Sequence, residues 1–224
     1  MPNASGNAYG LTTLCPIRNG QKGGTSYSNL IRKVLQELPE NQDSPLAKVA
    51  NTYLARFYIL NDAIFESFPN KLDRLQSSYL VFTSNLYGDL DLYLTGMWSS
   101  IQADIQTIWG NCVGFEKVNS ASSFIEYIKK CQVTTTFFFN GSTDDPLEEQ
   151  LKSLFLKQEF SKFVFAHQGV PPAKLLPDFK EFINYAQPEV LAFPTWRAGM
   201  CSLDGVCVDE RIEHKKSLSL SNNS

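Results

Sequence analysis

The sequence lacks the linear motifs by which many enzyme classes are recognised. No GxSxG, P-loop, HExxH, GxGxxG or CxxC pattern occurs in its 224 residues. These patterns mark the nucleophile, phosphate, zinc and dinucleotide sites of common enzymes. Their absence argues against hydrolase, kinase, metalloprotease and Rossmann-type oxidoreductase activity. Acid–base chemistry by tyrosine, aspartate or histidine needs no linear motif and stays open.

Histidine and cysteine are also scarce. The chain has two histidines, His167 and His214, and five cysteines. The odd number and irregular spacing of the cysteines argue against a disulfide framework. Cys201 and Cys207 could form a loop disulfide or half of a metal site, although two ordinary thiols are the simpler interpretation. A zinc site of cysteine and histidine has few ligands to draw on here.

The chain has neither a basic stripe nor a long apolar run. Its net charge is −3 and its pI about 5.5, which argues against a nucleic-acid partner. No apolar run approaches the roughly 18 residues of a membrane span. The N-terminal MPNASGNAYG has no signal-peptide pattern. A hydrophobic content of 43% is typical of a globular chain. We therefore expect a cytoplasmic protein that does not associate with membranes.

Strand and helix patterns alternate in the first part of the chain. Residues 10–18 form a β-type run, and Thr25 or Ser26 is the expected N-cap of a helix that follows it. The segments TYLARFYIL, 52–60, and SSYLVFTSN, 77–85, predict two strands. This order is strand, helix, strand, strand.

A second helix and a last strand complete the predicted pattern. Asp89 is expected to cap an amphipathic helix with apolar positions from 90 to 112. CVGFEKV, 112–118, indicates a further strand or edge segment, and 120–131 a short helix capped by serine. The β-branched and aromatic run QVTTTFFFNGS, 132–142, predicts a strand. The βαββαβ order is that of an α+β, ferredoxin-like antiparallel sheet with helices on one face.

The C-terminal part is predicted to be helical only at first. A long helix begins near Pro146, and acidic residues crowd its first turn. The proline-rich segment 169–200 shows no clear element. The expected domain organisation is a flexible N-terminus over 1–9, a single ferredoxin-like α+β domain over 10–208 with a helical C-terminal extension over about 144–208, and a disordered tail over 209–224.

Arg56 interrupts an otherwise apolar strand. Side chains alternate along a strand, so Leu54, Arg56 and Tyr58 share one face. A buried charge without a partner is costly. Arg56 could therefore anchor the carboxylate, phosphate or haem propionate of a bound molecule, with Tyr53 and Tyr58 as further ligand contacts. Alternatively, it snorkels to water or forms a salt bridge; the candidate partners are Asp62, Asp89 and Asp91.

The segment SNLYGDLD, 84–91, places an amide and two carboxylates at a strand-to-helix junction. Asn85, Asp89 and Asp91 could bind a cation or position a substrate. Asp89 could equally serve only as the helix cap. Both interpretations stay open at this point.

His167 ends the predicted long helix, after the aromatic and small residues of FVFA. It could be a haem or metal ligand, a general base, or a cation that interacts with the helix C-terminus. Trp196 and Arg197 form a second candidate pair in the proline-rich segment. They could form a lid over a ligand pocket or pin the C-terminal segment to the body.

Four segments together resemble a known group of proteins. They are LTTLCPIRNG, LARFYILND, YLVFTSNLYGDLDLYL and IWGNCVGF. The succession resembles bacterial proteins of the ferredoxin-like, dimeric α+β-barrel type, some of which are similar to dye-decolourising peroxidases. The likeness covers roughly residues 10–140. It implies a haem held by a histidine beside a distal aspartate and arginine, while SNLYGDLD is only loosely similar to the distal GFxDG motif of the peroxidases.

The functional expectation follows from this resemblance and from the candidate residues. We expect an enzyme that acts on a small hydrophobic or aromatic substrate, with His167, Arg56 and Asp89 as its catalytic set. It would be a haem-dependent oxidoreductase, or a cofactor-free oxygenase, isomerase or cyclase as in members of the fold without haem. The alternative is a non-catalytic ligand-binding protein. An uncovered apolar sheet face favours a homodimer.

Overall fold

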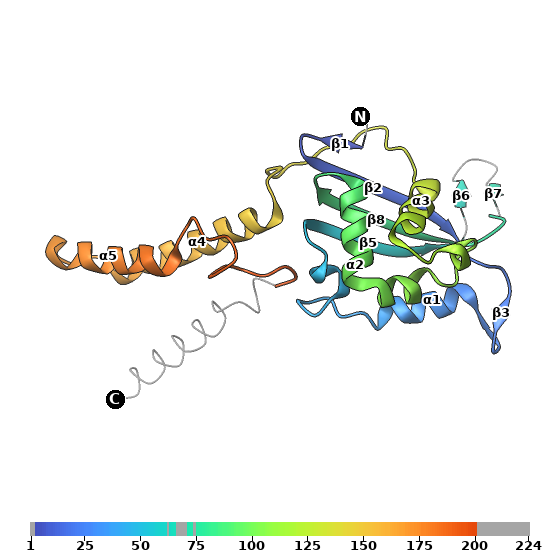
Figure 1. Ribbon diagram of the computed structural model, residues 1–224, viewed down its shortest axis with the longest axis horizontal. Helices are drawn as coiled ribbons and strands as arrows, with labels where there is room; N and C mark the ends of the chain where they lie inside the picture. Colours follow the sequence, from blue (N-terminus) through green and yellow to red (C-terminus); the bar gives the residue numbers. More distant parts are fainter. Residues whose placement is uncertain (1–2, 62, 66–70, 74, 201–224) are drawn as a thin grey trace. The chain divides into compact units, whose positions relative to one another are not determined.

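The computed structural model describes residues 3–61, 63–65, 71–73 and 75–200. The chain divides into two compact units (Figure 1). The first comprises residues 1–38 and 45–150, and the second residues 39–44 and 151–224. The single-domain organisation expected from the sequence stays a prediction, and the expected tail, 209–224, lies outside the described residues.

A four-stranded antiparallel sheet organises the first unit. Its strands are β1 (Ala4–Ser5), β2 (Ala8–Pro16), β8 (Tyr79–Tyr87) and β5 (Thr52–Leu60), in that spatial order. Two-stranded pairs add β3 (Gln21–Lys22) with β4 (Thr25–Ser26), and β6 (Ala63–Phe65) with β7 (Lys71–Asp73). The α+β class is therefore confirmed, and β5 has the predicted bounds. Strands β1 and β2 include residues of the N-terminal segment that the sequence led us to expect to be flexible.

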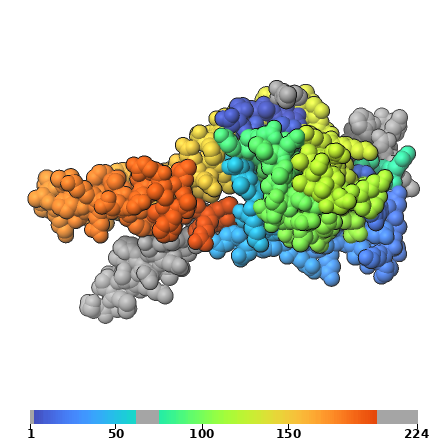
Figure 2. All heavy atoms as spheres, in the orientation of Figure 1, coloured from blue at the N-terminus to red at the C-terminus, as the bar shows by residue number. Residues whose placement is uncertain are grey.

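Helices cover one face of this sheet (Figure 1). They are α1 (Tyr27–Gln36), α2 (Leu90–Trp109) and α3 (Ala121–Cys131), with 3-10 turns at Pro45–Lys48 and Phe115–Lys117. In Figure 2 the green and yellow-green atoms of α2 and α3 gather over one face of the first unit. Ser26 caps α1, Asp89 caps α2 and a Ser120–Ser123 capping box starts α3. The sequence had predicted each of these starts.

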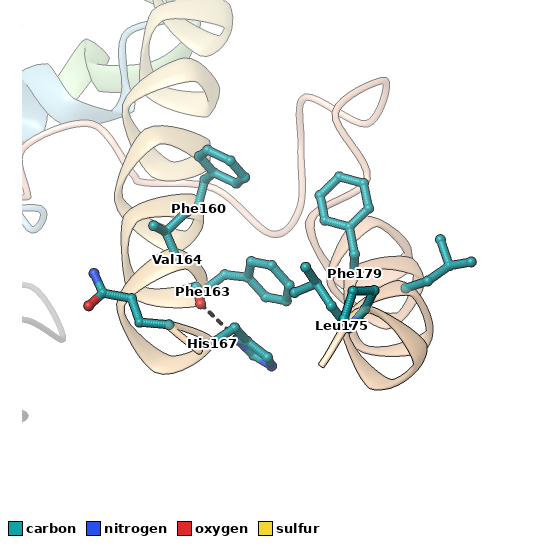
Figure 3. Close-up of a pocket in the computed structure, with 9 residues that line it drawn as sticks. Phe160, Phe163, Val164, His167, Leu175 and Phe179 are labelled. Carbon is teal, nitrogen blue, oxygen red and sulfur yellow. Dashed lines mark hydrogen bonds between the residues drawn. The ribbon is translucent and has the colours of Figure 1, made fainter. Parts of the chain in front are cut away.

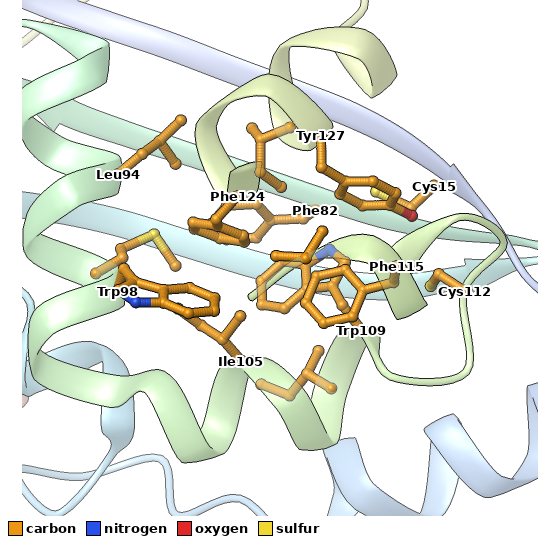
Figure 4. Close-up of a cluster of buried hydrophobic side chains, with 14 of the residues drawn as sticks. Cys15, Phe82, Leu94, Trp98, Ile105, Trp109, Cys112, Phe115, Phe124 and Tyr127 are labelled. Carbon is orange, nitrogen blue, oxygen red and sulfur yellow. The ribbon is translucent and has the colours of Figure 1, made fainter. Parts of the chain in front are cut away.

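An aromatic cluster forms the centre of the core between sheet and helices (Figure 4). Phe57 of β5 and Phe82 of β8 stack with their ring centroids 4.7 Å apart. Trp109 of α2 meets both rings edge-on at 5.4 Å, and Phe124 of α3 lies against Trp109. Aromatic pairs at these distances bury much apolar area in preferred geometries. The amphipathic face of α2 thus joins the sheet to α3.

The predicted strand over 132–142 is wrong. Gln132 makes an isolated bridge with Thr13, and the Val133 amide donates to Thr12 O at 2.8 Å. Beyond this point the edge of β2 is occupied, because β1 already pairs with Ala8 and Tyr9. The chain leaves the edge, and no strand forms over 132–142. The ferredoxin-like strand order is therefore not confirmed. The predicted strand over 112–118 is a 3-10 turn with one bridging residue, Cys112.

The C-terminal part contains α4 (Leu147–Ala166) and a helix that the sequence analysis missed, α5 (Pro172–Ala186). Proline misled the prediction. Pro172 occupies the first turn of α5, where its fixed φ suits a helix. An N–H in this turn would have no intrahelical acceptor, so proline loses no hydrogen bond there. Pro177 lies inside α5, in a position where the pattern suggested a break.

Lys152 fixes the end of α5 within the second unit. Its side chain is 3% exposed, and its ammonium donates to Ala186 O at 2.5 Å and Pro194 O at 2.7 Å. Burial lowers the pKa of Lys152, against the opposing attraction of Glu189. The last carbonyls of a helix are favourable partners for a cation.

Within the part of the chain that the structure describes, no helix is long and apolar enough to cross a membrane.

Candidate functional site

Arg56 lies on the face of the sheet opposite the helices. It is exposed, and so are Leu54 and Tyr58 on the same face, whereas Phe57 belongs to the core on the other face. The Nε of Arg56 donates to Thr83 Oγ1 at 3.3 Å. No acidic side chain among the described residues pairs with its guanidinium. Among the described residues, four of its five N–H donors have no partner and can face water or a ligand.

The strand register arranges the neighbours of Arg56 in rows. Arg56 lies opposite Thr83, and Thr83 lies opposite Thr12. In the next row, Tyr58 lies opposite Val81 and Val81 opposite Leu14. The open face thus presents a guanidinium and two hydroxyls beside an apolar strip. Tyr58 is 46% exposed and Val81 is fully buried, so this strip is accessible only toward β5. Leu54, in the row on the other side of Arg56, is 59% exposed.

One end of the open face is covered by the chain itself. A side-chain carbon added to Gly10 would lie 2.8 Å from the ring of Phe138, so this ring packs directly on the backbone of β2. Gly10 pairs with Asn85, which pairs with Leu54. The segment after α3 therefore borders the row next to Arg56. Glycine is required at this point because any side chain would displace Phe138.

Tyr53 helps to hold that segment and does not face Arg56's row. Its hydroxyl donates to Asp145 O at 2.6 Å. Burial, followed by the nearby carboxylate of Asp144, raises the pKa of Tyr53 to about 12. A phenol with this pKa stays protonated at neutral pH and remains a donor. Its observed contact is structural.

The two aspartates of SNLYGDLD have structural partners. Asp89 Oδ1 accepts from the amides of Asp91 at 2.8 Å and Leu92 at 3.1 Å, which is the geometry of an N-cap. Asp91 forms an ion pair with Lys129 at 2.6 Å, and so ties α2 to α3. Neither carboxylate pairs with Arg56, and Asp62 lies outside the described residues. Asn85, by contrast, lies on the open face, one row from Arg56.

His167 follows the last turn of α4 and has partners on both ring nitrogens. Nδ1 lies 2.8 Å from Phe163 O (Figure 3). Nε2 lies 3.2 Å from Asp178 Oδ2 of α5. Both partners are acceptors, so both contacts are hydrogen bonds only when both ring nitrogens carry protons. The Phe163 ring stacks on the imidazole at 4.1 Å. The imidazole thus lies at the C-terminal end of α4, between a backbone carbonyl and a carboxylate.

The arrangement around His167 does not fit a haem ligand. A metal-binding imidazole needs one nitrogen without a proton, and both nitrogens of His167 face acceptors. His167 itself lines a pocket of about 520 Å³ that is otherwise almost wholly apolar, with Phe160, Val164, Leu175, Leu176 and Phe179 (Figure 3). The lining would suit an apolar ligand, so the case against a haem ligand depends on the ring nitrogens alone. Among the described residues no group of three His, Cys, Asp or Glu side chains could hold a metal ion.

The predicted catalytic set is not brought together within one unit. His167 belongs to the second unit, whereas Arg56 and Asp89 belong to the first. Trp196 and Arg197 follow α5 in the second unit and do not line its pocket. The backbone amide of Arg197 donates to Met200 Sδ at 3.2 Å. A lid role for Trp196 and Arg197 stays a prediction.

A pocket that the sequence analysis did not find lies in the first unit. Its volume is about 610 Å³, and residues of β2, α3 and the intervening turn line it, among them Leu14, Pro16, Lys117, Tyr127 and Cys131. Cys15 and Cys112 are buried nearby (Figure 4). The cysteines are far apart in sequence, at irregular spacing. Only the lysines next to Cys131 could have indicated an unusual thiol.

The comparisons with known proteins do not assign a family. No protein-family model matches the chain, and no curated protein or solved structure shows significant similarity to it.

Proposed function

We propose that the first unit binds a small apolar molecule carrying an anionic group, with Arg56 of the open sheet face as the anchor. One observation supports this most directly. The guanidinium of Arg56 stands exposed between Leu54 and Tyr58, and its only described side-chain partner is the Thr83 hydroxyl. A planar guanidinium with free donors matches a carboxylate or phosphate through paired charge-assisted hydrogen bonds.

The surroundings of Arg56 favour ligand binding over catalysis. The described side chains in its row and the next are Thr83, Thr12, Tyr58, Val81 and Leu14. The Arg56 guanidinium stays protonated, and Tyr58 is the only ionisable side chain among these five. The non-catalytic alternative therefore has more support than the haem-dependent oxidoreductase, for which His167 has no free nitrogen. A cofactor-free enzyme that uses Tyr58 as an acid is the remaining catalytic version of this proposal.

The ferredoxin-like relationship also belongs to this proposal. Along the chain, α1 lies between β2 and β5, and α2 follows β8. In the sheet, β8 lies between β2 and β5. This arrangement supports a βαββα core. The final strand would then be replaced by the short bridge of Gln132 to Thr13. In proteins built this way the open face is free to receive a ligand or a second copy.

The test is ligand-induced stabilisation with matched arginine variants. Thermal unfolding of the full chain is measured with aliphatic and aromatic carboxylates and with their uncharged amides. We expect one or more carboxylates to raise Tm where the amide does not, since a ligand that binds only the native state stabilises it. Arg56→Met should weaken binding about 10- to 100-fold, which corresponds to about 1.5–3 kcal/mol for a hydrogen bond to a charged group.

The control is Arg32→Met, which removes an arginine of α1. It should leave the ligand-induced shift unchanged. Equal shifts in wild type and Arg56→Met, or equal shifts with carboxylates and amides, would contradict the proposal. Turnover of a bound ligand by metal-free protein would move the assignment from binding to cofactor-free catalysis.

A homodimer through the same face is a second candidate. Leu54 and Tyr58 are large and exposed side chains on one edge strand, and such surfaces favour association. Leu54→Arg would then convert a dimer to a monomer in sedimentation velocity. A monomer at all concentrations in the unaltered chain would exclude this candidate.

A further inference from the structure

Two cysteines distant in the sequence meet at the pocket between β2 and α3, which we call the β2–α3 pocket. Cys131 is the last residue of α3, is half-buried and lines the pocket. Cys15 of β2 is completely buried. The bridge between Thr13 and Gln132 brings the end of α3 to the edge of β2 and so brings the two thiols together. Cys15 Sγ lies 3.7 Å from Thr13 Oγ1, and its thiol can instead donate to Cys131 when Cys131 is a thiolate.

The two thiols differ strongly in character. The hydrogen bond from Cys15, then one from Tyr127 and the charge of Lys130 lower the pKa of Cys131 to about 7, although burial opposes this. The same hydrogen bond, together with burial, raises the pKa of Cys15. Burial raises the pKa of Cys112 to about 12. Cys131 is therefore a thiolate for a large part of the time at neutral pH, beside a neighbour that keeps its proton.

This arrangement has the parts of a reactive thiol site. The nucleophile is the thiolate, and its reactivity is highest when its pKa is near the ambient pH. The β2–α3 pocket gives a small molecule access to Cys131, and the Tyr127 hydroxyl, which lies 3.4 Å from Val113 O, borders the same cluster. Cys15 supplies a second sulfur that can donate to the Cys131 thiolate. A low-pKa accessible cysteine next to a second cysteine is the pattern of a redox-active pair.

We propose that Cys131 reduces a hydroperoxide that enters the β2–α3 pocket, and that Cys15 resolves the product as a Cys15–Cys131 disulfide. This function is independent of the anion site at Arg56. No described group of ligands suits a metal ion, so the proposed chemistry uses sulfur alone.

The reaction has two balanced steps. In the first, the Cys131 thiolate attacks the terminal oxygen of the hydroperoxide, and the O–O bond breaks. The sulfur loses two electrons and becomes a sulfenic acid, and the alkoxide or hydroxide that leaves takes up a proton from water. In the second, the sulfur of Cys15 attacks that of Cys131, and the S–O bond breaks. The hydroxide released combines with the Cys15 thiol proton as water.

The experiment uses the full chain with Cys201→Ser and Cys207→Ser, so that the cysteines outside the described residues do not react. Reduced protein receives one equivalent of hydrogen peroxide, and peptide mass spectrometry follows. We expect a Cys15–Cys131 cross-linked peptide. In Cys15→Ser the disulfide cannot form, and dimedone should label Cys131 as the sulfenic acid. Cys131→Ser should lose both products, whereas Cys112→Ser should retain the disulfide.

A pH profile supplies a second readout that does not require a peroxide. The rate of alkylation of Cys131 by iodoacetamide should rise with pH with a midpoint near 7 in the parent chain. In Cys15→Ala the midpoint should move upward, because the donor that stabilises the Cys131 thiolate is removed. Arg56→Met should leave both the disulfide yield and the midpoint unchanged, so failure here is distinguishable from failure of the anion-site proposal.

Several outcomes would overturn the proposal. They are a disulfide that joins Cys112 instead of Cys15, dimedone labelling of Cys15→Ser that spares Cys131, and peroxide consumption that is the same in Cys131→Ser as in the parent. An alkylation midpoint of Cys131 above pH 8 would also overturn it, because the thiolate would then be a minor species at neutral pH.

Discussion

At the scale of single residues, several candidate side chains prove to have structural partners. Asp89 caps α2, Asp91 pairs with Lys129, and His167 bonds Phe163 O and Asp178. For each of these three side chains, a structural role was one of the interpretations that the sequence allowed. Arg56 differs from these three, because its side chain lies on the open face, donates only to the Thr83 hydroxyl and has no acidic partner among the described residues. Residue type alone did not distinguish between these interpretations. The contacts of each side chain in the fold were needed to find its structural partners.

The Asp89 cap yields a prediction at this scale. Asp89→Ala removes the acceptor for the amides of Asp91 and Leu92, so the free energy of unfolding should fall by about 0.5–2 kcal/mol. Urea denaturation monitored by circular dichroism measures this. Asp89→Asn is the matched control and should stay within a few tenths of a kcal/mol of wild type, since asparagine caps equally well. A large loss in Asp89→Asn would show that the negative charge itself is needed.

At the scale of elements, the long-range position of a segment overrode its local propensity. Residues 132–142 have the β-branched and aromatic composition of a strand. They form none, since the β1 hairpin occupies the edge of β2 that they would extend. Conversely, α5 forms despite its prolines because one of them starts the helix. The α4–α5 pair is then tied by His167, Asp178 and the surrounding phenylalanines.

The tie between α4 and α5 yields a prediction at this scale. His167→Ala and Asp178→Asn should each destabilise the chain modestly, and a double-mutant cycle should give a coupling energy of about 0.5–1 kcal/mol, as expected for a partly exposed ion pair. Thermal or urea unfolding measures the four variants. Additive effects would show that the two side chains act separately.

The same variants test the haem interpretation. Added hemin should give identical Soret spectra with wild type and His167→Ala, because both ring nitrogens of His167 already have partners. A Soret shift in wild type that is lost in His167→Ala would restore the histidine as a ligand.

At the scale of the whole molecule, the buried apolar side chains are concentrated in the first unit. The large fully buried side chains, Trp109, Phe82, Phe115 and Phe124 among them, all belong to it. Among the described residues of the second unit, only Lys152, Ala186 and Pro194 are buried. Its aromatic side chains are largely exposed, and Phe165 is 75% exposed. The two units should therefore differ in local stability.

Hydrogen exchange measures that difference. Amides of α2 and β8 should exchange much more slowly than those of α4 and α5, since amides in a well-buried core open only with global unfolding. The comparison is made by mass spectrometry on the intact chain at one pH. Equal protection in both units would show that the amides of the second unit are shielded from water by something other than the described residues.

Local signals in the sequence determined the α+β class, strand β5, the starts of α1, α2 and α3, and the unusual arginine of β5. Each depends on alternation, helical periodicity or capping within about ten residues. The tertiary structure alone decided which face Arg56 occupies, that residues 132–142 form no strand, and that Cys15 and Cys131 meet. The physical reason is that strand pairing and side-chain contacts join residues far apart in the chain, and no local pattern encodes which edges and faces are already occupied.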